Sequence, residues 1–428
     1  MNPFIDPKNP ITSVSEACIK CGKCIPSCTV HMANSDEVTS PRGFLDLLGA
    51  YKRGELELDK NVKDIFESCF LCTACTEICP NDLPVDMVIE QARDDIRKKF
   101  GLAWYKKLFF FLLRHRRVMD LLAKFGYVFQ TCGFKIQEKQ EAMKPRFSLP
   151  IIKKDRFLPS AKAKTFLNSH PEVIKNGGKA KVAIFIGCLA NYTYTDIGKA
   201  LLKILKTLEV DAYLIKNQLC CGAPAYFTGD FDTVEYLATH NIEYFESFID
   251  EVDAIIVPEA TCSAMLKQDY LHFFQDRPNW LKRVERLNKK IYMATQWLEK
   301  ETNLAEILAN KGKQMSEIIT YHDPCHAKKM QGIYKEPREL IKQNYTIKEM
   351  SDPNRCCGFG GVTIQTEKFH LAKAAGLPKA SMIDDSGADI VSAECSACRM
   401  QITNSLHYNN SKVIFKNPIE LIAKALES

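Results

Sequence analysis

Residues 18–28 read CIKCGKCIPSC, and residues 69–80 read CFLCTACTEICP. Both follow the spacing C-x2-C-x2-C-x3-C, in which one tight loop supplies three thiolates and a fourth cysteine closes the site. This spacing suits a [4Fe–4S] cube, because the loop amides can also hydrogen-bond the cluster sulfides. Zinc is the alternative, but it takes four ligands in two pairs, and eight cysteines in two such runs exceed that number. The doubled run therefore predicts two [4Fe–4S] clusters.

The ligands of the two clusters are predicted to cross between the runs. In two-cluster ferredoxins, the fourth cysteine of each run serves the other cluster. We therefore expect one cluster on Cys18, Cys21, Cys24 and Cys79, and the other on Cys69, Cys72, Cys75 and Cys28. Apolar residues at helical spacing over 44–51 and 85–98 predict an α-helical ferredoxin domain spanning residues 1–95. The runs differ where Thr29 follows the first and Pro80 follows the second.

The composition is that of a globular protein rich in free cysteine. The chain has 428 residues, of which 18 are cysteine, 46% are hydrophobic and 26% are charged. These proportions suit about three domains and exclude a disordered chain or a membrane-spanning bundle. The longest strictly apolar run, residues 108–113, is far shorter than the ~20 residues of a spanning helix. Residues 1–10 show no secretory pattern, so thiols in a reducing cytoplasm are expected rather than disulfides.

A basic, aromatic segment follows the ferredoxin domain. Residues 96–135 hold ten basic residues and a single acid, Asp120. Helical spacing sets an apolar face against a basic side that carries Lys106, Lys107, Arg114 and Arg117. This pattern is typical of an interfacial helix attracted to anionic lipid; packing on the protein body or on a partner subunit is the alternative. Residues 136–180, with four prolines and many lysines, are predicted to form a linker with little regular structure.

The sequence repeats from residue 181 onward. In each half a buried strand leads to a cysteine, then to a helix, a Cys-Cys-Gly corner and a second strand ending in cysteine. Offsets of 133 to 137 residues relate Cys188 to Cys325, Cys220 to Cys356, and Cys262 to Cys395. So steady an offset indicates two copies of one domain. Alternating strands and helices predict two tandem α/β Cys-Cys-Gly domains facing each other, over residues 181–310 and 311–428.

The Cys-Cys-Gly corners are candidate metal sites, because glycine at positive φ lets two adjacent thiolates turn toward one point. The second domain offers Cys325, Cys356, Cys357, Cys395 and Cys398, which predict a third iron–sulfur cluster, with zinc as the alternative. The first domain offers Cys188, Cys220, Cys221 and Cys262. Met265 stands where its last cysteine would be, so an empty or labile site, or plain structural thiols, are expected there. His322 and His326 are expected to be neighbours of the second site, not ligands, and Cys132 to be a small buried hydrophobe.

The doubled ferredoxin runs followed by two Cys-Cys-Gly domains resemble the iron–sulfur subunits of bacterial flavin-linked dehydrogenases. The resemblance covers about residues 18–96 and 182–426. Residues 41–43 (PRG) are similar to the glycolate oxidase and lactate branch. Residues 187–192 (GCLANY) and 321–326 (YHDPCH) are similar to the iron–sulfur subunit of anaerobic glycerol-3-phosphate dehydrogenase. Heterodisulfide reductase shares the Cys-Cys-Gly domain in one of its subunits.

The resemblance implies an electron-transfer subunit of an oxidoreductase complex. It implies electron flow from a small hydroxy acid, glycolate or lactate, through an FAD-containing partner subunit to quinone, at the cytoplasmic face of the inner membrane. Glycerol 3-phosphate as substrate is one alternative, and a heterodisulfide-reductase-like catalytic role for the second Cys-Cys-Gly site is another. The sequence contains neither G-x-G-x-x-G after a strand nor a Walker A loop. We therefore expect no flavin site, substrate site or catalytic side chain of its own, and no nucleic-acid partner.

Overall fold

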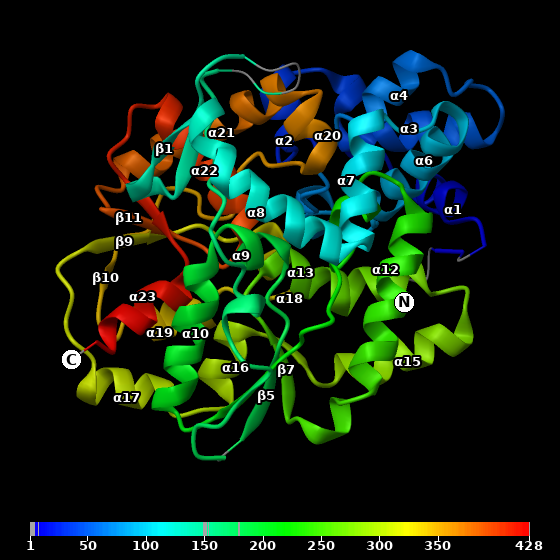
Figure 1. Cartoon of the computed structure of the whole chain (residues 1–428). Coiled ribbons are helices and arrows are strands. Elements are labelled where there is room, and N and C mark those ends of the chain that lie inside the picture. Colours follow the sequence, from blue (N-terminus) through cyan, green and yellow to red (C-terminus); the bar gives the residue numbers. More distant parts are fainter. Residues whose placement is uncertain (1–4, 7, 149–151, 153, 179, 428) are drawn as a thin grey trace.

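The N-terminal domain is built from helices that surround the cysteine loops. The computed structural model describes residues 5–6, 8–148, 152, 154–178 and 180–427 (Figure 1). The helices of this domain are α1 (Pro10–Glu16), α2 (Thr29–Asn34), α3 (Pro41–Lys52), α4 (Lys60–Phe66), α5 (Ala74–Glu77) and α6 (Val85–Phe100). The Ser40 hydroxyl accepts a hydrogen bond from the Gly43 amide and so caps α3. α6 buries one apolar face against α1, α3 and α4. The predicted helical domain is confirmed.

The first α/β domain contains a five-stranded sheet in the order β4-β6-β5-β7-β8. Its strands are β4 (Val173–Ile174), β5 (Lys181–Ile184), β6 (Asp211–Leu214), β7 (Ala254–Val257) and β8 (Ile291–Met293). All pair in parallel except β4, which pairs antiparallel at the edge. Every residue of β7 is buried, as expected for a central parallel strand covered on both faces. The main helices are α9 (Cys188–Tyr192), α10 (Thr195–Thr207), α11 (Ala223–Tyr226), α12 (Phe231–Glu246), α13 (Ala260–Ala264), α14 (Tyr270–Phe273), α15 (Pro278–Asn288), α16 (Ala294–Lys300) and α17 (Leu304–Lys311).

The second α/β domain contains a four-stranded parallel sheet in the order β10-β9-β11-β12. Its strands are β9 (Ile318–Tyr321), β10 (Thr346–Ile347), β11 (Ile390–Ser392) and β12 (Ile414–Lys416). This order is the same as β6-β5-β7-β8, which confirms the predicted repeat. Its helices are α18 (Cys325–Gln331), α19 (Glu336–Ile341), α20 (Gly361–Thr366), α21 (Phe369–Asp385), α22 (Ser396–Tyr408) and α23 (Pro418–Ala425).

The two α/β domains pack against each other through helices and through two buried glutamates. α10 packs against α23, and α13 packs against α18. Glu259 lies after β7 of the first domain, and Glu394 lies after β11 of the second. Glu259 accepts a hydrogen bond from the Ser396 amide at 2.7 Å, and Glu394 accepts one from the Thr295 amide at 3.2 Å. Burial raises the pKa of both carboxyl groups to about 8.

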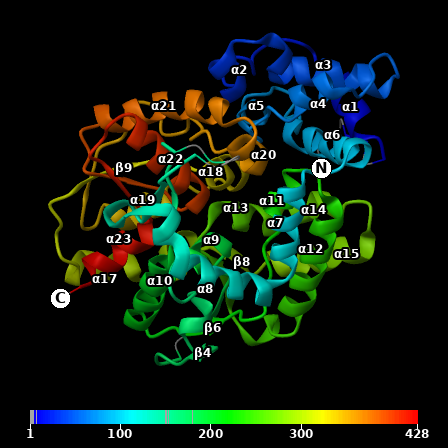
Figure 2. The same ribbon diagram turned by 45° about the horizontal axis from the view of Figure 1, so that its top comes forward.

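The N-terminal domain is anchored to both α/β domains (Figure 2). α2 packs on α21 of the second domain. In α6 the buried guanidinium of Arg93 donates to the carbonyls of Phe66 and Cys69, and to that of Phe227 in the first α/β domain at 2.6 Å. Gly229 approaches so closely that a Cβ would lie 2.3 Å from the Arg93 carbonyl carbon. These contacts fix the position of the cysteine loops.

Helices α7 (Trp104–Arg114) and α8 (Arg116–Gly133) lie across the outside of the molecule (Figure 1). No residue of α8 is buried. Polar side chains hold α8 to the protein: Arg116 donates to the Gln218 carbonyl, Asp120 accepts from Tyr192, and Gln130 pairs with the Ala161 backbone. Apolar side chains point outward instead: Val118, Leu121, Leu122, Phe125, Val128 and Phe129. No described helix is both long and apolar enough to cross a membrane.

Two expectations about this helical segment were wrong. Lys106 is not on an exposed basic side: it is buried and forms a 2.7 Å ion pair with Glu367 of the second α/β domain. Arg114 lies over the Tyr236 ring, 4.4 Å from its centroid. Cys132 is exposed, not buried. The basic side of the segment is therefore reduced to residues such as Lys107 and Arg117, which are exposed.

The segment predicted to be an unstructured linker carries short strands. β1 (Phe134–Gln137), β2 (Ala142–Pro145) and β3 (Leu158–Pro159) form an antiparallel sheet. Glu141 forms an ion pair with Arg399, which is buried in α22 and also pairs with Glu420 at 2.9 Å. The prolines thus end strands without leaving the segment loose. Pro150, on which the linker prediction partly depended, lies outside the described residues.

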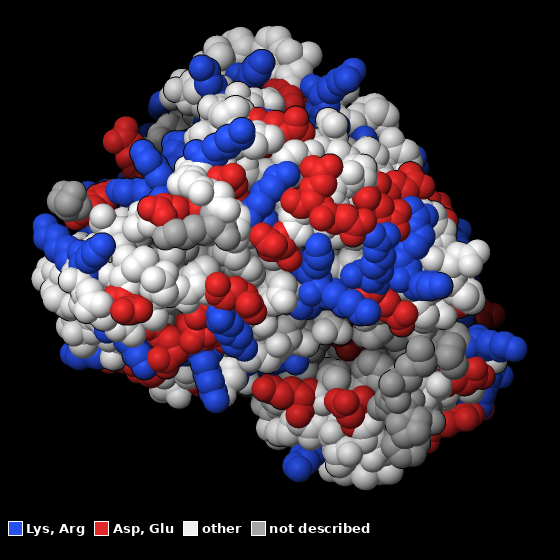
Figure 3. Space-filling view, turned by 90° about the horizontal axis from the view of Figure 1, so that it is seen from below, with Lys and Arg blue, Asp and Glu red and all other residues white. Residues whose placement is uncertain are grey.

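Acidic and basic side chains are mixed on the face drawn in Figure 3. The whole chain has a formal net charge of +6, and Lys and Arg alternate with Asp and Glu across this view. A surface that binds nucleic acid would present a continuous basic stripe. The face in this view shows no continuous basic stripe, and the absence of a nucleic-acid partner stays a prediction.

Candidate iron–sulfur sites

The first group of cysteines brings together Cys18, Cys21, Cys24 and Cys79, which line one cavity. The loop has positive φ at Lys20 (56°) and Gly22 (75°). This alternation curls the backbone around a point, so that successive amides turn inward. Cys21 is exposed, and the neighbouring Ile19 is 65% exposed. This group is therefore the one nearest to solvent.

The second group brings together Cys69, Cys72, Cys75 and Cys28 around another cavity. Its loop repeats the same conformation, with positive φ at Leu71 (52°) and Thr73 (55°), although neither residue is glycine. Such non-glycine conformations cost about 1–3 kcal/mol each and persist where the surroundings impose them. Thr29 follows Cys28 at the place where the second run has a proline. Its hydroxyl lies 3.5 Å from the Cys72 sulfur, a contact that a proline could not make. Cys79 thus lies with the first run and Cys28 with the second, although Cys75 lines both cavities. The crossed ligand sets and the clusters themselves stay predictions.

In the second α/β domain, five cysteines converge at the carboxyl ends of β9, β10 and β11, the usual place for a ligand in an open parallel sheet. Cys325 begins α18, Cys356 and Cys357 form the corner after β10, and Cys395 and Cys398 open α22. The Cys357 and Cys398 sulfurs are 3.4 Å apart. Hydrogen bonds from neighbouring thiols lower the pKa of Cys357 and Cys395 to about 6, so both favour the thiolate form that binds metal.

In the first α/β domain, four cysteines occupy the equivalent strand ends: Cys188, Cys220, Cys221 and Cys262. Here the pKa of all four thiols is raised, mainly by neighbouring sulfurs and by burial. In the second domain the pKa is raised at Cys325, Cys356 and Cys398 and lowered only at Cys357 and Cys395. Donation to Cys220, together with burial, raises the pKa of Cys188 well above its ordinary value. Although Cys221 donates to Cys262, burial and nearby sulfurs raise the pKa of Cys262 to about 12.

Met265 is fully buried, and its methyl group would lie 3.5 Å from a Cβ on Gly222 of the corner. The strand register and the helix N-caps match Cys262 to Cys398 and Glu259 to Cys395. The expectation that Met265 stands in place of the last cysteine was therefore wrong, and a buried carboxyl group holds the position of the missing thiolate.

The second N-terminal group directly adjoins the five-cysteine site. The thiols of Cys72 and Cys356 lie close enough across the two domains for each to shift the pKa of the other. Lys329 of α18 lies beside them with a side chain that is only 3% exposed, and its Nζ is 4.0 Å from Glu77 of α5. Although burial opposes its charge, the sulfurs of Cys72, Cys325 and Cys356 raise the pKa of Lys329 above its ordinary value. A buried positive charge therefore lies at the junction of two groups of thiols.

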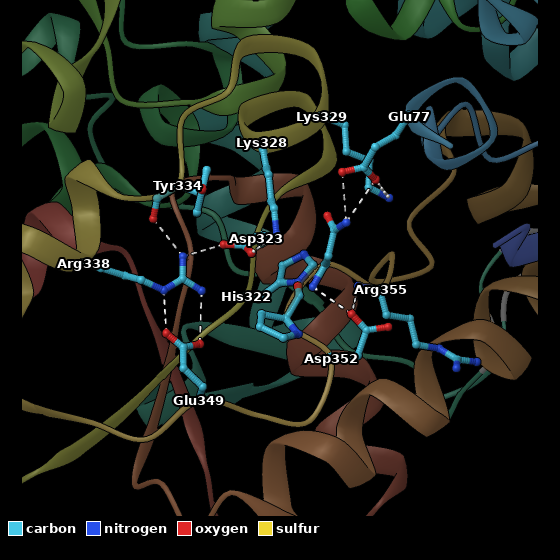
Figure 4. A network of polar contacts seen from close by, with 12 residues as sticks. Glu77, His322, Asp323, Lys328, Lys329, Tyr334, Arg338, Glu349, Asp352 and Arg355 are labelled. Carbon is cyan, nitrogen blue, oxygen red and sulfur yellow. Dashed lines mark hydrogen bonds and ion pairs between the residues drawn. The ribbon is translucent and has the colours of Figure 1, made fainter. Parts of the chain in front are cut away.

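Figure 4 shows how polar contacts hold the loop that leads to Cys325. Asp323 accepts from Lys328 at 3.0 Å and from Arg338 at 2.6 Å, and Arg338 also pairs with Glu349. Asn354 donates to both carboxylate oxygens of Glu77, at 3.2 and 3.0 Å. Sequence reasoning missed Lys329 and Glu77, because only the folded chain places them together. In the sequence, the nearness of Lys328 and Lys329 to Cys325 is the one feature that indicates a positive charge beside the site.

The site residues fit iron–sulfur cofactors by their donor chemistry. Three separate groups of four or five thiols converge, and the cysteines of the described chain are free. Buried sulfur ligands with backbone amides directed at them suit clusters more than single exposed cations. The first α/β domain fits less well, because Glu259 stands where the second domain has the thiol of Cys395.

Comparisons with protein families agree with this organisation. The family described as "4Fe-4S dicluster domain" matches residues 14–83. The family described as "Cysteine-rich domain" matches twice, over residues 182–267 and 319–403. A crystal structure of a hypothetical protein from Helicobacter pylori has the same overall fold, with a TM-score of 0.52 and 11% identity. That likeness covers 95% of this chain and 71% of the other.

Three relatives share much of this chain. The "Probable glycolate oxidase iron-sulfur subunit" of Bacillus subtilis is 28% identical over 356 residues, covering 81% of this chain and 79% of the relative. A fumarate reductase (CoM/CoB) subunit of Methanothermobacter marburgensis is 28% identical over 427 residues, covering 97% of this chain and 73% of the relative. "Lactate utilization protein A" of Bacillus cereus is 30% identical over 225 residues, covering 52% of this chain and 90% of the relative.

Proposed function

The chain belongs to the family of iron–sulfur proteins that join a 4Fe-4S dicluster domain to two cysteine-rich domains, and from this we propose an electron-transfer subunit of a flavin-dependent dehydrogenase complex. Its electrons come from glycolate or lactate, oxidised to the keto or aldehyde acid on a partner that holds FAD, and they go to quinone. Clusters bound at the cysteine groups supply one-electron steps between a two-electron donor and a two-electron acceptor. The relatives named for glycolate oxidase and lactate utilisation support this substrate class.

The contact between Cys72 and Cys356 carries this proposal. It sets the second N-terminal group against the five-cysteine site, so that thiols of three groups form one series through the protein. The series begins at the exposed loop around Cys21 and Ile19, where a partner protein can approach. A chain whose cysteines bind cofactors in sequence, and which contains no G-x-G-x-x-G motif, suits a relay rather than a catalytic protein with its own flavin.

α7 and α8 supply a surface for peripheral attachment to the inner membrane at its cytoplasmic face. Trp104 is 72% exposed and Phe129 is 61% exposed, with further apolar side chains along the same face. Asp120 and Gln130 of α8 contact the protein, while most of its apolar side chains face outward beside the exposed basic residues Arg117 and Lys124. An ordinary surface helix keeps its apolar side chains against the protein. Exposed apolar side chains flanked by basic residues suit the boundary between lipid headgroups and acyl chains. Quinone would then be reached without a spanning helix.

The test is isolation of the tagged full-length chain, together with its native partners, under anaerobic conditions. We expect a co-purifying flavoprotein, and reduction of the iron–sulfur absorbance on adding glycolate or lactate but not glycerol 3-phosphate. The isolated chain should contain no flavin and should stay oxidised with each substrate. Tightly bound flavin in the single chain, or reduction by substrate without the partner, would contradict the proposal. Reduction by glycerol 3-phosphate, but not by glycolate or lactate, would identify glycerol 3-phosphate as the substrate of the complex.

A second candidate function is catalytic reduction at the five-cysteine site, as in heterodisulfide reductase. The low pKa of Cys357 and Cys395, and the relative named for a fumarate reductase (CoM/CoB), favour it. Such a role requires reduction of a disulfide to two thiols by two electrons and two protons. Thiol release from an added disulfide, driven by the reduced chain alone, would support it over the relay.

A further inference from the structure

His322 is a buried histidine at the end of β9 whose environment is unlike that of an ordinary core residue. Its side chain is 1% exposed. One of its imidazole nitrogens and the sulfurs of Cys357 and Cys398 all lie within 4.8 Å of one another. Three different donor groups therefore face the same small volume at the five-cysteine site.

The orientation of the imidazole is set by a single carbonyl. Nδ1 of His322 lies 3.2 Å from the Pro353 carbonyl oxygen, which also accepts from the Asp323 amide at 3.0 Å and from Lys379 at 3.1 Å. A carbonyl can only accept, so Nδ1 carries the proton and Nε2 carries the lone pair. Nε2 is buried and, among the described residues, has no hydrogen-bond partner. Leaving such a group unpaired costs about 1–3 kcal/mol, so a partner is expected when the site is filled.

On the basis of the third cluster proposed above, we infer that His322 binds an iron of that cluster through Nε2. The arrangement matches the usual way in which a metal-binding histidine is held, with its second nitrogen donating to a backbone carbonyl. The site is then of mixed cysteine and histidine ligation. A neutral nitrogen in place of an anionic sulfur raises the reduction potential of an iron–sulfur centre, as the replacement of cysteine by histidine does in Rieske centres.

The first α/β domain provides an internal contrast. Cys188 corresponds to Cys325, so the residue three places before it, Phe185, corresponds to His322. Phe185 is fully buried and stacks edge-on against Phe245 at 5.8 Å. In the first domain, which has only four thiols, this position is the apolar Phe185. In the second domain, which has five, it is the nitrogen donor His322. His326 is a weaker candidate, because its Nδ1 lies 3.4 Å from the Cys325 sulfur and its ring stacks on Phe227.

Pulsed electron paramagnetic resonance of the full-length chain, labelled with 15N-histidine, tests the inference. The signal of the second site is defined as the one that Cys357→Ser removes. We expect a strongly coupled nitrogen on that signal, with a coupling that changes on isotope substitution. His322→Gln should abolish the coupling, and the matched control His326→Gln should retain it. The signals of the two N-terminal clusters should persist in both variants and show that the chain has folded.

A second variant distinguishes ligation from a structural role. His322→Cys should keep the cluster, lose the nitrogen coupling and shift the ratio of oxidised to reduced cluster at least tenfold toward oxidised. For one electron this is a fall in potential of about 59 mV. A second-site signal without coupled nitrogen, or a coupling that survives His322→Gln, would overturn the inference and leave the proposed cluster intact. Absence of any iron beyond that of the N-terminal clusters in the unaltered chain would overturn both.

Discussion

The two α/β domains share a strand order, a Cys-Cys-Gly corner and the place of their first cysteine, but three matched positions differ. Glu259 stands where the second domain has Cys395, Phe185 where it has His322, and Tyr192 where it has Lys329. The fold is thus common to both domains, whereas the side chains at the strand ends differ, and with them the predicted ability to bind a cluster. The comparison teaches that a repeated domain can retain its shape after its site has changed.

The two sites also differ in what covers them. Lys329 reaches Glu77 of the N-terminal domain, which covers the five-cysteine site. Its counterpart Tyr192 donates to Asp120 of α8 at 2.6 Å. The hollow beside Cys188 and Cys220 is lined by residues of α7 and α8, including Leu113 and Met119. One site therefore faces a relay domain, and the other lies beneath an outward-facing apolar helix.

The largest expected difference between the domains is in iron. Cys357→Ser should remove the cluster signal of the second site completely, because Cys357 is one of two thiols whose pKa is lowered to about 6. Cys221→Ser, at the matching corner, should leave that signal unchanged. Iron analysis and electron paramagnetic resonance of the two full-length variants check this. The opposite result would mean that the first domain holds the cluster.

Completing the first site should make the domains more alike. Glu259→Cys places a thiol three residues before Cys262, as Cys395 precedes Cys398. We expect the iron content to rise by nearly one cluster, since a fifth thiolate then helps to offset the ferric charge. Glu259→Gln, which keeps the volume without the thiol, should bind no more iron than the unaltered chain. If Glu259→Cys gains no iron, some other difference disables the site.

The helices α7 and α8, which cover the first site, should give this side of the protein an affinity for lipid that the other side lacks. Phe125→Glu combined with Val128→Glu should reduce co-sedimentation with anionic vesicles at least tenfold. Burial of one such side chain contributes roughly 1.5–3 kcal/mol. Val173→Glu, at an exposed apolar residue of β4, is the control and should bind normally. Lys107→Gln with Arg117→Gln should weaken binding less, by roughly 1 kcal/mol per charge at low salt. Unchanged sedimentation throughout would favour a partner subunit on α8.

The smallest expected difference is in stability at the two glycine corners. Gly358 has φ +86° and Gly222 has φ +98°, so alanine is strained at both by roughly 1–2 kcal/mol. A Cβ on Gly358 would also lie 2.9 Å from Cβ of Ala375 and 3.0 Å from the Ala372 carbonyl, whereas the nearest atom at Gly222 is 3.5 Å away. Gly358→Ala should therefore lower the thermal unfolding temperature more than Gly222→Ala, measured with the same iron loading. Equal losses would show that the corners are equally open.

Much of this architecture could be predicted because cysteine spacing is local information. The doubled run predicted the two cysteine groups of the N-terminal domain, and the offset between Cys188 and Cys325 predicted the repeat. Apolar residues at helical spacing over 44–51 and 85–98 predicted the helices of the N-terminal domain. Contacts between domains could not be predicted in this way: nothing near Lys329 in the sequence indicates Glu77. Helical periodicity over residues 105–117 predicted an amphipathic helix, which is mostly α7. It gave no indication that in α8 Asp120 would face the protein and most apolar residues would face outward. The strands within residues 136–180 were missed because prolines at strand ends resemble those of a loop.

Arg93 has a consequence for how fast electrons can move. Its guanidinium joins three carbonyls of two domains, and Gly229 leaves no room for a side chain beside it. An N-terminal domain held in this way cannot swing between a donor and an acceptor as a mobile carrier does. The separation of Cys72 from Cys356 is constant, and no domain motion through solvent precedes transfer between them. The rate of that internal step should therefore be independent of solvent viscosity, and only the encounter with the partner should slow in a thickened medium.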